Sequence, residues 1–136
     1  MISDAQGIPL AVRLTAANVN EVTQLPAMVE VIPAIKGKRG RPRRRPKIVQ
    51  GDRGYSSQEH RRWLRARHIQ PLLAKVDTPH GSGLGKTRWV VERTLAWLHH
   101  FRRLRIRWER RDDIHYAFLV IGAALIAFNF IQKGFC

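Results

Sequence analysis

Two acidic residues in different contexts are the first candidates for chemistry in this sequence. Asp52 follows the short apolar run Ile48-Val49 and has Gly51 and Gly54 nearby, whereas Glu92 lies inside a stretch with helical spacing. A carboxylate at the carboxyl end of a strand in an open α/β sheet faces the crevice where ligands bind. Two such carboxylates can share divalent metals and act on phosphodiesters, because paired metal ions stabilise both the attacking and the leaving oxygen.

Each acid also has a purely structural interpretation. Asp52 could be an ordinary turn residue at the end of a strand, and Glu92 could form an exposed i,i+4 ion pair with Arg88. The helix face that carries Arg88 and Glu92 continues with Ala96 and His99. An Arg at this position can neutralise a phosphate. The basic surroundings of both acids favour the functional interpretation.

The overall charge predicts a polyanionic partner. The sequence has 25 Lys and Arg against 10 Asp and Glu, with a formal net charge of +15 in 136 residues. Nucleic acid is the first candidate partner and an anionic membrane the second. A hydrophobic content of 44% with four Trp excludes a disordered basic tail and fits one domain. The single Cys136 and the absence of a signal-peptide pattern predict a cytoplasmic protein.

Two arginine-rich segments are candidate DNA-binding surfaces. The segment 36–47 has eight positive residues and no negative one, so we expect an extended, exposed linker. Within it, Arg39-Gly-Arg-Pro42 is similar to the core of an AT-hook, which inserts Arg into a narrow minor groove. The alternative is a solvated insertion that contacts phosphates without sequence preference. The candidate DNA-binding residues here are Lys38, Arg39, Arg41, Arg43, Arg44, Arg45 and Lys47.

The second surface comprises Arg102, Arg103, Arg105 and Arg107. These residues alternate with apolar side chains, which predicts an extended or edge segment with one basic side.

Strands and helices that alternate along the chain must position these residues. We expect strands at 8–15, 47–50 and 69–74, and helices at 21–35, 56–67, 87–104 and 114–132. This order predicts an α/β fold. A turn at 4–7 so close to the first residue leaves the strand 8–15 without a preceding partner, so we expect a missing amino-terminal portion. The apolar run 117–131 is shorter than the roughly 20 residues of a membrane span, so we expect a buried core helix and no membrane partner.

Several motifs together resemble bacterial insertion-sequence transposases of the DDE class, over essentially the whole chain. The motifs are Gly51-Asp-Arg-Gly-Tyr55, Arg88-Trp-Val-Val-Glu-Arg-Thr-Leu-Ala-Trp97, Phe101-Arg-Arg-Leu-Arg-Ile-Arg-Trp-Glu-Arg110, and Asp4-Ala-Gln-Gly-Ile-Pro-Leu10 with Thr15-Ala-Ala-Asn-Val-Asn20. The resemblance implies a ribonuclease-H-like α/β fold and metal-dependent DNA cleavage and strand transfer with two Mg²⁺ or Mn²⁺ ions. By this match Asp52 is the second acid of the triad and Glu92 the third, with Arg88 as a catalytic neighbour.

The sequence departs from the family pattern at two positions around Glu92. Relatives often carry a Tyr and a Lys where Gly85 and His99 stand here. Trp89 is the replacement stacking aromatic, and we count Trp89 and His99 among the DNA-binding residues.

The first acid of the family precedes the segment that matches Asp4, and Asp4 itself is expected to be a turn residue without a catalytic role. The resemblance therefore implies the carboxy-terminal part of a single catalytic domain, residues 1–136, inactive alone. It also implies the DNA of transposon ends and target as partner, an upstream transposase polypeptide or a homo-oligomer, and a location at the bacterial nucleoid. The alternatives are a noncatalytic DNA-binding remnant and a basic membrane-active protein.

Overall fold

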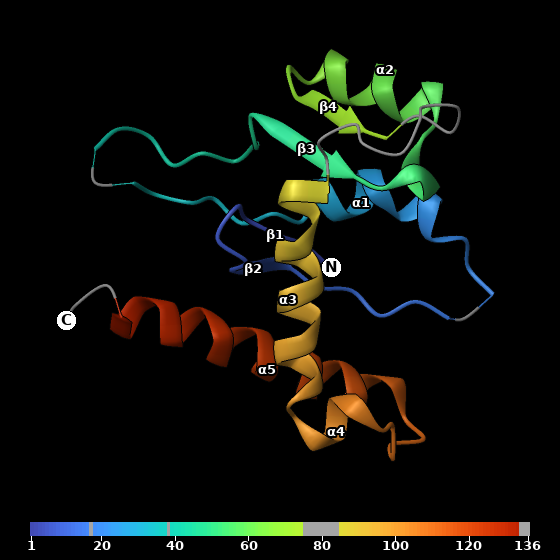
Figure 1. Ribbon diagram of the computed structural model, residues 1–136, viewed down its shortest axis with the longest axis vertical. Helices are drawn as coiled ribbons and strands as arrows, with labels where there is room; N and C mark the ends of the chain where they lie inside the picture. Colours follow the sequence, from blue (N-terminus) through green and yellow to red (C-terminus); the bar gives the residue numbers. More distant parts are fainter. Residues whose placement is uncertain (17, 38, 75–84, 134–136) are drawn as a thin grey trace. The chain divides into compact units, whose positions relative to one another are not determined.

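The computed structural model describes residues 1–16, 18–37, 39–74 and 85–133, and only the backbone of residues 21, 85–88 and 133. The chain divides into two compact units, one of residues 16–88 and one of residues 1–15 with 89–136. Each unit is described by itself. Both contain helices and strands, which confirms the predicted mixture of the two (Figure 1). The sequence also predicts a glycine-rich loop at 77–85, of which residues 77–84 lie outside the described residues.

The unit of residues 16–88 contains a parallel pair of strands joined by a helix. Strand β3 (Ile48–Gly51) pairs with β4 (Gln70–Leu73) so that Gly51 lies opposite Leu73. Helix α2 (Gln58–Ala66) connects them and packs on β4 (Figure 1). The Ser57 hydroxyl accepts the His60 N–H at 3.2 Å and caps α2, where the sequence predicts either Ser56 or Ser57 as the cap. A helical crossover of this kind is how parallel neighbours are connected.

The helix expected at 21–35 is shorter than predicted. A 3₁₀ turn, η1 (Glu21–Gln24), leads into α1 (Leu25–Glu30). Pro26 lies in the first turn of α1, where its missing N–H removes no helical bond, and the helix ends before Pro33. The core of this unit is formed by Leu25, Met28, Val29, Ile32, Val49, Leu64, Ile69 and Leu73.

The other unit begins with a short antiparallel hairpin. Strand β1 (Ile2–Ser3) pairs with β2 (Pro9–Ala11). Asp4 forms the turn between them, since its Oδ1 accepts the N–H groups of Gln6 and Ile8 at 2.9 and 2.8 Å. The predicted turn is confirmed. The expectation that the strand after it has no preceding partner is wrong, because β1 supplies that partner.

Three helices complete this unit: α3 (Gly85–His99), α4 (Arg102–Arg105) and α5 (Asp112–Lys133). The single helix predicted for 87–104 is therefore two helices. The buried face of α3 carries Val90, Thr94 and Leu98, whereas the apolar side chains of Val91 and Leu95 are 37% and 41% exposed.

Helix α5 approaches the other two helices closely at Gly122. A Cβ there would lie 3.0 Å from Leu104 Cδ1 and 3.3 Å from Leu98 Cδ2. The helix predicted at 114–132 is confirmed by α5. The expectation that this helix is buried is wrong, because Gly122 and Ile126 are its buried residues and most of its apolar side chains are exposed. Its length and mean hydropathy of 2.1 would also permit a membrane span, a property that apolar helices of soluble proteins share.

Candidate functional site

Asp52 stands at the carboxyl end of β3, as the sequence predicts. Its side chain is exposed, and its Oδ1 accepts the Gly54 N–H at 3.0 Å at the start of the 3₁₀ turn η2 (Arg53–Tyr55). Within the described part of the chain, Oδ2 accepts no hydrogen bond. The turn interpretation of Asp52 is therefore confirmed, and one carboxylate oxygen is left facing solvent.

The two glycines beside Asp52 are required by close contacts inside this unit. A Cβ at Gly51 would lie 2.9 Å from Leu73 Cδ2 and 3.3 Å from Tyr55 Cβ. A Cβ at Gly54 would lie 3.1 Å from Asp52 Oδ1. A side chain at Gly51 would press on the Leu73 side chain and one at Gly54 on the Asp52 carboxylate, so the two glycines leave room for the packing around Asp52.

Arg61 is a cation at this edge that sequence reasoning missed. Its guanidinium donates to the Leu73 carbonyl at 2.8 Å and to the Ser56 hydroxyl at 3.2 Å. Because Leu73 lies opposite Gly51, these bonds hold Arg61 at the carboxyl edge of the strand pair. Only the parallel pairing of β3 with β4 reveals this position, since no local motif marks it.

Glu92 lies on α3 in the unit of residues 1–15 and 89–136. Glu92, Ala96 and His99 are all exposed, so the predicted polar face of the helix is open to solvent. Trp89 is also exposed, at 49%. The side chain of Arg88, the fourth member of this face, lies outside the described residues.

Helix α3 is fixed beside Glu92 by the amino-terminal turn. The fully buried Thr94 hydroxyl donates to the Gly7 carbonyl at 2.8 Å, with the Val90 carbonyl at 3.0 Å as an alternative acceptor. Arg93 donates to the Gln6 carbonyl at 2.6 Å. Breaking the buried hydrogen bond between Thr94 and Gly7 would cost about 1–3 kcal/mol, because it would leave a buried polar group unpaired. Sequence reasoning missed these contacts because they join residues 87 positions apart.

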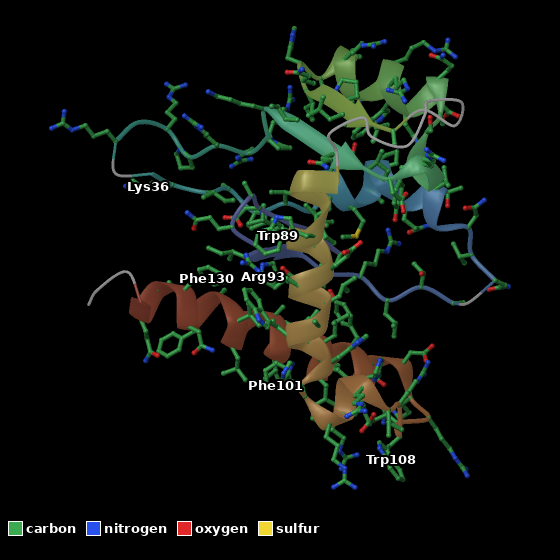
Figure 2. All side chains as sticks on the ribbon, viewed as in Figure 1. Lys36, Trp89, Arg93, Phe101, Trp108 and Phe130 are labelled. Carbon is green, nitrogen blue, oxygen red and sulfur yellow. The ribbon has the colours of Figure 1, made fainter. Side chains whose placement is uncertain are left out.

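Arg93 also lies between two tryptophans of α3. Its guanidinium carbon is 4.4 Å from the Trp89 ring centroid and 4.7 Å from that of Trp97 (Figure 2). Trp97 in turn contacts Phe130 of α5, with ring centroids 5.7 Å apart. These contacts orient Trp89 next to Glu92.

The acids are thus distributed between the two units, with Asp52 in one and Glu92 in the other. Within the residues that the structure describes, no three His, Cys, Asp or Glu side chains gather in a group that could hold a metal. Asp4 is engaged in its own turn, as the sequence predicts. Asp52 and Glu92 are therefore exposed carboxylates that belong to different units.

The basic segment 36–47 was expected to be extended, but part of it forms a hairpin. Ile35 and Arg43 exchange backbone hydrogen bonds of 2.9 and 2.8 Å, which close residues 35–43 into a hairpin. Gly40 near its tip has φ +94°, which favours glycine. We call residues 35–47 the basic hairpin. Its cationic side chains that the structure describes are exposed and form no ion pair, and these are Lys36, Arg39, Arg41, Arg43, Arg44, Arg45 and Lys47. Lys38 lies outside the described residues.

The second predicted surface, Arg102 to Arg107, is not extended either, because its first four residues form α4. Two arginines of this surface pair with acids that follow it, Arg103 with Glu109 at 2.7 Å and Arg107 with Asp112. Just beyond it, Arg111 pairs with Asp113 at 2.6 Å. We call residues 102–113 the paired segment. Arg102 and Arg105 form no ion pair among the described residues.

Glu109 is the most enclosed acid of the paired segment, with a side chain 6% exposed. Burial opposes its ionised form, but hydrogen bonds from the backbone and from Arg103 outweigh burial, so the pKa of Glu109 lies below its usual value. The pKa of Asp113 is lowered as well, chiefly by the hydrogen bond from Arg111.

The sequence matches the Transposase DDE domain family over residues 1–129. It is similar to the "Putative transposase for insertion sequence element IS402" of Burkholderia cepacia, with 61% identity over 134 residues that cover 98% of this chain and 64% of the relative. It is also 32% identical, over 107 residues, to the "Transposase for insertion sequence element IS1106" of Neisseria meningitidis serogroup B, which covers 71% of this chain and 33% of the relative. No solved structure matches the chain. The chain therefore spans less than two thirds of the length of either relative.

Proposed function

This chain belongs to the DDE-domain transposase family, and on that premise we propose that it forms part of a catalytic domain that cleaves and joins DNA when an insertion sequence moves. The observation that carries the proposal is the match of residues 1–129 to the family, since this range includes both Asp52 and Glu92. We further propose that residues 1–136 belong to one ribonuclease-H-like domain, in which β3 and β4 are neighbouring parallel strands.

Asp52 and Glu92 are the proposed ligands of two Mg²⁺ or Mn²⁺ ions. Their chemistry fits, because both ions prefer carboxylate oxygen and water, and both side chains are exposed. Asp52 in particular keeps Oδ2 outside its turn. When bound, such ions stabilise the charge that develops on the attacking and leaving oxygens of a phosphodiester.

The chain's own side chains would position the DNA around these acids. Arg88 would neutralise a phosphate, while Trp89 and His99 would contact the DNA beside Glu92. Arg93 supports Trp89 by stacking on it and bonding to Gln6, so the ring is held in place before DNA arrives. The hydrogen bonds of Arg61 to Leu73 and Ser56 maintain the edge where Asp52 stands.

The proposal assigns two carboxylates of the site to this chain, whereas the family resemblance implies three. We therefore propose that another polypeptide, or a second copy in an oligomer, contributes to the complete site, and that the 136 residues alone do not cleave DNA. With DNA as its partner, we propose that the protein acts in the cytoplasm, at the nucleoid.

The basic hairpin is the proposed contact with the DNA backbone outside the catalytic site. Its described cations have no internal carboxylate partner, so phosphates are the natural counterions. Of the second predicted surface, Arg102 and Arg105 remain available for phosphates, while Arg103 and Arg107 share their charge with Glu109 and Asp112.

The test is nicking of a supercoiled plasmid with Mg²⁺ or Mn²⁺, by the chain alone and mixed with a polypeptide that supplies the family's first acid. We expect metal-dependent nicking only from the mixture, abolished by Asp52→Asn and by Glu92→Gln. Glu59→Gln, which removes an exposed acid from the first turn of α2, is the matched control and should leave nicking unchanged. Nicking that survives either of the first two substitutions contradicts the proposed roles.

The second candidate function is a noncatalytic DNA-binding protein. The observation that favours it is the set of exposed cations in the described part of the basic hairpin. Salt-sensitive DNA binding without nicking, in the mixture as well as alone, would support this alternative.

A further inference from the structure

A small cleft beside α4 combines positive charge with an exposed aromatic ring. It is lined by Arg102, Arg103 and Trp108 and has a volume of about 210 Å³. Trp108, on the segment that follows α4, is 59% exposed (Figure 2). Such a cleft is smaller than the roughly 300–1,000 Å³ of pockets that enclose whole small molecules. Its size suits part of a single nucleotide and not a double helix.

The two arginines of the cleft have different roles. Arg103 is held by the enclosed carboxylate of Glu109, 2.7 Å from its Nη1, so its guanidinium is fixed and its charge is largely offset. Arg102 has no carboxylate partner among the described residues, and its guanidinium carbon lies 5.9 Å from the Trp108 ring centroid. The cleft therefore presents one uncompensated cation beside one open aromatic face.

Another Arg–Trp pair, on α2, shows what a completed stack looks like. There the Arg67 guanidinium carbon is 3.8 Å from the Trp63 ring centroid, and Arg67 pairs with Glu30 at 3.2 Å. The half-buried Trp63 ring carries a close guanidinium whose charge is paired with a carboxylate. Arg102 also lies over the Trp108 ring, but at 5.9 Å and with no carboxylate partner among the described residues, and the ring stays 59% exposed. This difference distinguishes a stack that is already satisfied from one that can still accept a ligand.

From this contrast we propose that the cleft binds a single unpaired nucleotide of DNA, with the base stacked on Trp108 and the phosphate on Arg102. An unpaired base offers a flat face that aromatic side chains stack on in single-stranded nucleic acid, while a paired base within a duplex does not. The adjacent phosphate supplies the negative charge that Arg102 lacks. The inference rests on the proposed function, because it takes DNA as the ligand.

The test compares the affinity of the full 136-residue chain for a fluorescent single-stranded oligothymidylate and for a duplex of the same length. Removing one base stack lowers affinity by about 5- to 150-fold, so Trp108→Leu should weaken single-strand binding by that factor. Its effect on duplex binding should stay below about twofold. Trp108→Phe keeps an aromatic face and should restore most of the single-strand affinity.

Two matched controls separate the site from general effects. Trp63→Leu removes the covered tryptophan and should leave single-strand affinity unchanged. Arg102→Gln and Arg105→Gln each remove one positive charge from α4, but only Arg102 lines the cleft. Arg102→Gln should therefore weaken single-strand binding more than Arg105→Gln does. Far-ultraviolet circular dichroism of each variant checks that the fold is retained, and the Arg102/Arg105 comparison still tests the site if Trp108→Leu does not fold.

The outcomes distinguish this inference from the function on which it rests. Equal losses for single strand and duplex, or no loss at all, in Trp108→Leu would overturn the nucleotide site while leaving DNA binding intact. Failure of the unaltered chain to bind either form of DNA would overturn both.

Discussion

The basic hairpin and the paired segment have a similar density of positive charge, yet the structure treats them differently. Residues 36–47 carry eight positive residues and no acid, and the described ones form no ion pair. Residues 102–113 carry six arginines and three acids, and three of the arginines are paired with those acids. The charge of the basic hairpin is left for counterions outside the chain, whereas carboxylates inside the paired segment neutralise three of its six arginines.

The difference indicates that a count of positive residues does not locate a nucleic-acid surface by itself. Counterion release, which drives binding to DNA, requires cations that are not already paired. Cations that have internal carboxylate partners contribute instead to local structure. We therefore expect changes in the basic hairpin to alter DNA binding without altering stability, and changes at the paired arginines Arg103, Arg107 and Arg111 to do the reverse.

The largest expected effect is on DNA affinity in the basic hairpin. Each lost phosphate contact lowers the salt slope by about 0.9, so Arg39→Gln/Arg41→Gln should lower it by about 2 and weaken binding on the order of 50-fold at 0.1 M salt. Fluorescence anisotropy with a duplex across a salt series measures both quantities. The double variant Arg62→Gln/Arg65→Gln removes the same charge from α2 and serves as the control. An equal loss in the control would show that the hairpin has no special role.

A smaller effect is expected on thermal stability in the paired segment. Arg103→Gln leaves the enclosed carboxylate of Glu109 without its ion pair, so Tm should fall by roughly 2–8 °C. Differential scanning fluorimetry measures the change, and Arg39→Gln should shift Tm by less than about 1 °C. A larger shift in the hairpin variant than in Arg103→Gln would reverse the comparison.

The smallest effect is a difference in acid sensitivity. Because the folded-state pKa values of Glu109 and Asp113 are lowered, their contribution to stability is fully present above their ordinary pKa values near 4 and is lost as pH falls. The urea midpoint of the unaltered chain should therefore drop more steeply below about pH 4.3 than that of Glu109→Gln. Parallel curves for the two proteins would show that Glu109 does not couple folding to protons.

The local pattern of the chain was largely predictable, and the long-range contacts were not. The Asp4 turn, the Ser57 cap and the position of Asp52 after β3 follow from rules that act within a few residues, and all three are confirmed. The buried face of α3 does not follow the spacing of apolar residues, because Thr94, a polar residue, is buried through its bond to Gly7. Hydrophobic spacing alone assigns such a residue to the surface.

The site was predictable to the same extent. The positions of Asp52 on its strand end and of Glu92 on its helix could be read from spacing and resemblance. The roles of Arg61, Arg93 and Glu109 could not, because each depends on a hydrogen bond to a group on another element or loop. The exposure of α5 was missed because its composition is equally typical of a buried helix.

The docking of the Asp4–Gly7 turn on α3 also has a consequence for how the chain folds during synthesis. The turn is made among the first residues, but its partners Arg93 and Thr94 are 87 residues later. The contacts of the intervening unit, residues 16–88, are closer in sequence, and most of this unit is made before α3. Contacts with large sequence separation form slowly because a long loop must close first. We therefore expect the helix that carries Glu92 to acquire its native contacts after the strand end that carries Asp52.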